Sequence, residues 1–140
     1  MRLNKNNESA MDLQVEDVIA KAKKDESVLA VMLFGSHARG EGMPASDVDV
    51  CLVLSLGKET KADQEAVKWE YLSFQSKRLD LHIYQQLPLY IQTRVLKEGT
   101  VLFCRDEDAL YGLAYRTARA FEDFRPFYRE YLEQVARAGP

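Results

Sequence analysis

The sequence feature that most restricts the fold is an unbroken apolar run of seven residues, Val28 to Phe34, which stops at Gly35-Ser36. A continuous apolar run of this length, bounded by glycine, is typical of a β-strand that is buried on both faces. Residues 35–46 are rich in Gly, Ser, Pro and Ala, which indicates a turn-rich connection. We therefore predict a buried strand over 28–34, followed by a loop.

Helical and extended patterns alternate along the chain. The predicted helices cover 12–24, 60–76, 88–98 and 106–138, and the predicted strands cover 28–34, 47–54, 79–84 and 101–103. Pro126 is expected to kink or interrupt the last helix, because proline lacks the backbone donor that the helix needs. The alternation predicts an α+β (mixed α/β) fold: a small mixed sheet flanked by helices, with a C-terminal helix or kinked helix pair.

Length and composition limit the class of protein. The 140 residues predict a single domain over 1–140, with the polar residues 1–8 disordered. A net charge of −3 argues against a nucleic-acid backbone as the main partner, so no direct nucleic-acid binding is expected. No apolar run approaches the roughly 18–20 residues that span a bilayer, and no signal peptide is evident. We expect a cytoplasmic protein without a membrane partner.

Acidic residues alternate with aliphatic ones in two predicted strands. Residues two apart in a strand point to the same side, so Asp47 and Asp49 share one face. In the predicted strand 79–84, Asp80 and His82 likewise share one face. If these strands are neighbours, three carboxylates converge on one patch of the sheet.

Converging carboxylates repel one another unless a cation lies among them, and oxygen ligands suit Mg²⁺. The Gly35-Ser36 turn can bring backbone and hydroxyl donors close to a phosphate. Taken singly, each feature has an ordinary explanation. Gly35-Ser36 could be a simple turn, Asp47 and Asp49 a solvated strand end, and Asp80 a surface acid. Their conjunction, with ten residues between Ser36 and Asp47, favours a site for in-line attack on a phosphoryl group.

The chain resembles the polymerase-β-type nucleotidyltransferase superfamily in two stretches, Phe34-Gly35-Ser36-His37-Ala38-Arg39-Gly40 and Ser46-Asp47-Val48-Asp49. It is most similar to the minimal nucleotidyltransferases (MNT), whose members are commonly antitoxins paired with a HEPN-domain ribonuclease toxin. The resemblance implies a polymerase-β-like fold and a metal-dependent enzyme that uses ATP as substrate and two Mg²⁺ ions.

The resemblance also implies a role for each matched residue. Gly35 and Ser36 would hold the nucleotide phosphates, and Asp47 and Asp49 would bind the metal ions. Asp80 would complete the metal site and help to deprotonate the attacking hydroxyl.

Two further residues lie near these positions. Arg39 is either a phosphate contact or part of a salt bridge that pins the loop. His82 lies one step beyond Asp80, and we interpret it as a residue that packs beside the site or orients its ligands.

The C-terminal segment suggests a protein partner. The last 35 residues hold seven of the 14 aromatic residues and five arginines but no lysine, a composition typical of protein interfaces. The resemblance then implies an antitoxin that transfers AMP from ATP to a tyrosine hydroxyl of a cognate HEPN ribonuclease toxin, in a hetero-oligomer with it. Two alternatives stay open: a non-catalytic antitoxin that neutralises the toxin by binding, and a small-molecule nucleotidyltransferase.

Overall fold

A five-stranded mixed sheet forms the middle layer of the structure, a computed structural model that describes residues 2–3, 13–35 and 48–138. The strands are β1 (Arg2–Leu3), β2 (Val28–Phe34), β3 (Val48–Leu54), β4 (Leu79–Ile83) and β5 (Thr100–Cys104). Their order across the sheet is β1-β5-β2-β3-β4. Strand β2 is antiparallel to both β3 and β5, whereas β3 and β4 are parallel. The predicted mixed sheet is thereby confirmed.

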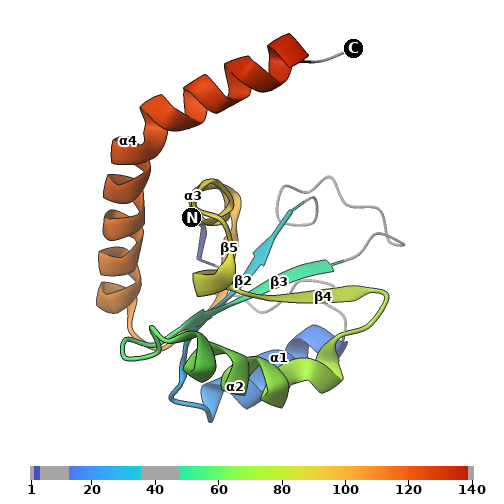
Figure 1. The fold of residues 1–140 in the computed structure, drawn as a ribbon. Helices are drawn as coiled ribbons and strands as arrows, with labels where there is room; N and C mark the ends of the chain where they lie inside the picture. The colour runs from blue at the N-terminus through green and yellow to red at the C-terminus, as the bar shows by residue number, and fades with distance from the viewer. Residues whose placement is uncertain (1, 4–12, 36–47, 139–140) are drawn as a thin grey trace.

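Helices cover both faces of the sheet (Figure 1). They are α1 (Leu13–Lys23), α2 (Lys61–Tyr71), α3 (Leu89–Glu98) and α4 (Glu107–Ala138), with single 3₁₀ turns at Leu72–Phe74 and Tyr84–Gln86. Helices α1 and α2 lie on one face, and α3 and α4 lie on the other. The hydroxyl of Thr60 caps α2 by accepting a hydrogen bond from the backbone N–H of Asp63 at 3.1 Å. The helix predicted from this cap ends earlier than expected, at Tyr71.

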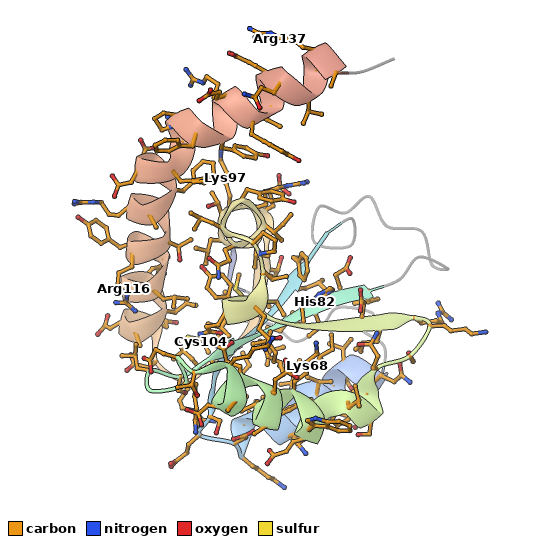
Figure 2. The ribbon with its side chains drawn as sticks, viewed as in Figure 1. Lys68, His82, Lys97, Cys104, Arg116 and Arg137 are labelled. Atoms are coloured by element: carbon orange, nitrogen blue, oxygen red, sulfur yellow. The ribbon has the colours of Figure 1, made fainter. Side chains whose placement is uncertain are left out.

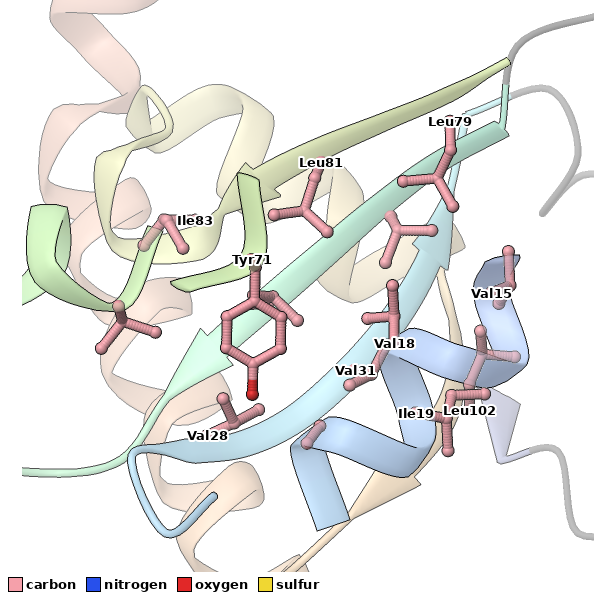
Figure 3. Packing of buried hydrophobic residues seen from close by; sticks show 14 of the residues in the cluster. Val15, Val18, Ile19, Val28, Val31, Tyr71, Leu79, Leu81, Ile83 and Leu102 are labelled. Atoms are coloured by element: carbon pink, nitrogen blue, oxygen red, sulfur yellow. The ribbon is translucent and has the colours of Figure 1, made fainter. Parts of the chain in front are cut away.

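The strand residues alternate between the two helical layers, so each face has its own apolar core. On the face covered by α1 and α2, the buried strand residues are Val28, Val31, Val50, Leu52, Leu54, Leu79, Leu81, Ile83 and Leu102 (Figure 3). On the face covered by α3 and α4, they are Leu29, Ala30, Met32, Cys51, Val53 and Val101. The apolar run at 28–34 is therefore a central strand enclosed from both sides, as its composition predicts.

Helix α4 is continuous over 32 residues and contains Pro126. It begins after Asp106, whose side chain accepts a hydrogen bond from the backbone N–H of Ala109 at 3.1 Å. Figure 1 shows that the helix bends along its length, so the predicted kink is present and the predicted interruption is not. None of the helices in the described part of the chain combines the length and hydropathy of a bilayer-spanning segment.

The N-terminal residues provide one correction. Residues 1–8 were expected to be disordered, yet Arg2 and Leu3 form the edge strand β1, paired in parallel with Thr100 and Val101 of β5. This pairing uses backbone groups along the free edge of β5, so it requires no apolar pattern in the added segment. The other residues of that segment lie outside the described ranges.

Candidate active site

The parallel pairing of β3 with β4 brings the two described acidic residues side by side. Asp49 on β3 lies directly opposite Asp80 on β4 in the strand register, and His82 lies two residues further along β4. Their side chains are on the face that α3 and α4 cover only in part, with 32%, 46% and 29% of each side chain exposed. The predicted convergence of Asp49 and Asp80 is therefore present, whereas Asp47 lies outside the described residues.

His82 points its Nε2 atom toward both carboxylates (Figure 2 labels the residue). The distances are 3.0 Å to Oδ2 of Asp80 and 3.6 Å to Oδ1 of Asp49. One donor atom from each of the three residues lies within 4.8 Å of the others. The sequence predicts only that His82 shares a strand face with Asp80, and the structure adds that its Nε2 atom lies close to both carboxylates.

Gly35 follows β2 immediately and adopts φ +81°, a conformation that glycine accommodates far more readily than other residues. A Cβ atom at this position would lie 2.6 Å from Oδ2 of Asp49, closer than such atoms can approach. Glycine is thus required here both for the turn and for the space that the carboxylate occupies. Ser36, to which the resemblance assigns phosphate binding, and Arg39, expected to contact a phosphate or to form a salt bridge that pins the loop, lie outside the described residues.

Two neighbouring side chains hold the acidic pair and the imidazole in place. Gln75 donates a hydrogen bond from Nε2 to Oδ1 of Asp80 at 2.9 Å, and its Oε1 accepts one from the backbone N–H of Leu81 at 2.9 Å. The ring of Phe34 meets that of His82 edge-on, with 5.3 Å between centroids. Sequence reasoning missed Gln75, because an isolated glutamine in the connection after α2 belongs to no pattern.

The donors at this site fit a divalent cation. Two carboxylates that face each other across adjacent strands need positive charge between them. Nε2 of His82 is buried and has no hydrogen-bond partner among the described residues, because its short approach to Asp80 falls outside hydrogen-bond geometry. A cation held by Asp49, Asp80 and His82 would satisfy all three side chains.

A pocket of about 200 Å³ lies beside this group. It is lined by Phe34 and Gly35 at the end of β2 and by Ile91, Arg94 and Glu98 of α3. The Arg94 guanidinium lies 3.9 Å from the carboxylate of Glu98, so the positive charge of Arg94 is paired with an acidic side chain of the same pocket. A somewhat larger pocket, of about 230 Å³, lies at the other end of β2 and β3 and contains none of the site residues.

Comparisons with known proteins agree with this geometry. Residues 16–108 match the family model described as "Polymerase beta, Nucleotidyltransferase". A Methanocaldococcus jannaschii protein named "Putative protein adenylyltransferase MJ1547" is 31% identical over 103 residues, which cover 74% of this chain and 77% of that relative.

Two solved structures share the fold, which confirms the expected polymerase-β-like architecture. A chain from a crystal structure of a toxin–antitoxin with AMP-PNP superimposes with a TM-score of 0.64 at 18% identity, over 86% of this chain and 98% of that one. A chain from the structure of tri-AMPylated Shewanella oneidensis HEPN toxin in complex with MNT antitoxin gives 0.62 at 16% identity, over 90% and 99%. By its family match and its curated relative, this chain belongs to the polymerase beta nucleotidyltransferase family.

Proposed function

We propose that this protein is a metal-dependent protein adenylyltransferase that acts as an antitoxin. It transfers AMP from ATP to a tyrosine hydroxyl of a partner HEPN ribonuclease toxin and thereby inactivates it. The observation that carries the proposal is the placement of Asp49 opposite Asp80, directly beside the Gly35 turn. The name of the M. jannaschii relative and the AMPylated toxin in the S. oneidensis structure support the choice of AMP and of a protein acceptor.

The proposed reaction is one in-line phosphoryl transfer. The tyrosine oxygen attacks the α-phosphorus of ATP, a new oxygen–phosphorus bond forms, and the bond to the β-phosphate breaks with release of pyrophosphate. In this proposal Asp80 would help to accept the phenolic proton, Gly35 and Ser36 would hold the phosphates, and Arg39 would contact them. Asp47, Asp49 and Asp80 are the residues that would hold two Mg²⁺ ions. When bound, such cations would supply Lewis-acid stabilisation of the charge that develops on the phosphate oxygens.

Helix α4 supports a protein partner. Five of its seven aromatic side chains are exposed, namely Tyr111, Tyr115, Phe124, Phe127 and Tyr131. Tyr128 instead stacks on Tyr90 of α3, with 5.4 Å between ring centroids. Part of the aromatic surface of α4 therefore packs within this chain. The stretch 118–138 contains no buried side chain, and it exposes the apolar side chains of Leu132 and Val135 as well. We propose that the exposed C-terminal part of α4 binds the toxin in a cytoplasmic hetero-oligomer.

Mass spectrometry tests the proposal directly. The purified protein is incubated with ATP, Mg²⁺ and the toxin encoded beside it, and the toxin is then weighed intact. We expect the toxin to gain mass in AMP units, and the gain to disappear with the double substitution Asp47→Asn/Asp49→Asn. No mass gain with any divalent metal would contradict the proposed activity.

The same double variant separates catalysis from binding. If the antitoxin acts by catalysis, the variant still co-purifies with the toxin but no longer protects cells from it. Protection that persists in the variant would instead favour neutralisation by binding through α4. Transfer of AMP to a small acceptor in the absence of toxin would favour the small-molecule alternative.

A further inference from the structure

His82 is the member of the candidate site that the carboxylate pattern of the sequence does not account for. We infer that its Nε2 atom is a ligand of the catalytic cation, and that this nitrogen makes the site select divalent transition metals over Mg²⁺. The inference deepens the proposed metal-dependent function and rests on it. It assigns His82 a metal-binding role instead of the packing or orienting role expected from the sequence.

The surroundings of Nε2 favour a positive partner. The atom is buried and lacks a hydrogen-bond partner among the described residues, a condition that costs about 1–3 kcal/mol for an ordinary polar group. Among the described residues, two carboxylates lie close to it, of Asp80 at 3.0 Å and Asp49 at 3.6 Å. Ionised carboxylates only accept hydrogen bonds, so an Nε2 atom that carries no proton would direct its lone pair toward further lone pairs. A shared cation turns this unfavourable arrangement into a ligand set.

The two distances from Nε2 agree with ligands of one cation. Neighbouring donor atoms at about 2.0–2.2 Å from a metal, in octahedral or tetrahedral arrangement, lie roughly 2.8–3.6 Å from one another. The separation of Nε2 from Oδ2 of Asp80, 3.0 Å, falls within this range, and the 3.6 Å to Asp49 lies at its upper end. Two ligands of one cation direct their lone pairs toward the cation and not toward each other. A short contact outside hydrogen-bond geometry is therefore the contact expected between them.

Neighbouring side chains fix the orientation of these donors before any cation binds. The edge-on contact with Phe34, at an interplanar angle of 68°, restricts the rotation of the His82 ring. The hydrogen bond from Gln75 occupies Oδ1 of Asp80 and leaves Oδ2 facing His82. Partners of this kind, which orient the ligands of a metal, typically raise its affinity.

A nitrogen ligand changes which metal the site prefers. Mg²⁺ is usually held by one or two carboxylates and keeps several waters, whereas imidazole is a common ligand of transition metals. Asp49 and Asp80 alone would accept either kind of ion. Because Nε2 of His82 completes their group, we expect Mn²⁺ and Co²⁺ to bind more tightly than Mg²⁺, by a margin that depends on this residue.

The chain contains only two histidines, His37 and His82, which makes a spectroscopic test unambiguous. The full-length protein is labelled with ¹⁵N in histidine alone, loaded with Mn²⁺ without nucleotide, and measured by pulsed EPR. We expect ¹⁵N coupling to Mn²⁺ in the wild type and in the matched control His37→Asn, and none in His82→Asn. In equilibrium titrations, His82→Asn should weaken Mn²⁺ binding by about 10–100-fold and Mg²⁺ binding by less than about threefold.

Each outcome decides the inference separately from the proposed function. Absence of ¹⁵N coupling in the wild type, or its persistence in His82→Asn, overturns the ligand role even if the protein transfers AMP to its toxin. Coupling that depends on His82 supports that role even if no AMP transfer occurs, in which case only the proposed function fails. Circular dichroism checks that His82→Asn is folded, and His82→Gln serves as the second variant if it is not.

Discussion

The two faces of the sheet are built from the same strands but serve different purposes. Toward α1 and α2, β3 presents Val50 and Leu52, both fully buried. Toward α3 and α4, β3 and β4 present Asp49, Asp80 and His82, each with 29–46% of its side chain exposed. The face toward α1 and α2 is closed by apolar packing. The face toward α3 and α4 leaves these three polar side chains accessible at its end near Gly35.

This difference shows how a small domain carries a site of like charges without losing its core. The closed face supplies apolar burial, worth roughly 1.5–3 kcal/mol for each large side chain. The accessible face holds the carboxylates where water and a cation reach them, which lowers their desolvation cost. If this interpretation is right, substitutions in the core toward α1 and α2 and substitutions at the polar end of the other face should affect different properties.

The largest contrast is expected between Leu52→Ala and Asp80→Asn. Leu52 is fully buried, so its truncation should lower the free energy of unfolding by about 2–5 kcal/mol. Asp80→Asn should leave that free energy within about 0.5 kcal/mol of the wild type while it abolishes AMP transfer. Urea unfolding and the toxin mass assay measure the two properties. Equal destabilisation by both substitutions would contradict the division between the faces.

A smaller effect is expected from Gly35→Ala. The substitution places a Cβ in a turn with φ +81° and against Oδ2 of Asp49, so the carboxylate must move. Displacing a reacting group by about 1 Å can cost on the order of 100-fold in rate, so we expect AMP transfer to fall by about 10–100-fold.

Gly57→Ala is the matched control for this substitution. Gly57 also has a positive φ, +96°, but a Cβ there meets nothing within 4 Å. Both variants should lose about 1 kcal/mol or more of stability from backbone strain, measured by thermal unfolding. Only Gly35→Ala should lose transfer beyond what its stability explains, and a similar loss in Gly57→Ala would argue that backbone strain alone is responsible.

The smallest effect is a loss of stability at alkaline pH. Burial raises the pKa of Tyr84 from 10.0 to about 12, although a hydrogen bond with Thr117 opposes the shift. The unfolded chain loses this proton near pH 10 while the folded chain retains it, so the unfolded state binds fewer protons between pH 10 and 12. The contribution of Tyr84 is fully present below pH 10 and falls by at most about 1.4 kcal/mol per pH unit above it.

Thermal unfolding between pH 9 and 11.5 measures this dependence, and Tyr84→Phe should make it shallower. Tyr71, on the opposite face, is expected to contribute in the same direction. Burial and its hydrogen bond to Asp25 raise the pKa of Tyr71. An unchanged pH slope in Tyr84→Phe would place the alkaline sensitivity on the α1–α2 face instead.

Local patterns in the sequence predicted much of the fold. The apolar run at 28–34 matches β2 residue for residue, and the two-residue alternation placed Asp49, Asp80 and His82 on the same faces that the structure shows. The bend of α4 followed from Pro126. In each case, the determining interactions lie within a few residues of one another along the chain.

Other features had no local signal. The pairing of Arg2–Leu3 with β5 joins segments that are distant in the sequence through backbone hydrogen bonds, which polar residues make as readily as apolar ones. Gln75 reaches Asp80 only because the connection after α2 returns along β4. Both the pairing of Arg2–Leu3 and the role of Gln75 therefore depend on contacts that composition and periodicity do not encode.

Local sequence is enough to assign side chains to a strand face and to locate the turns, because backbone geometry makes alternation and glycine conformations local properties. The packing of the whole chain decided that β3 and β4 are parallel neighbours with Asp49 opposite Asp80. It also decided that His82 turns Nε2 toward both carboxylates. Strand order and register depend on how the helical layers enclose the sheet, which is a property of the whole packed chain.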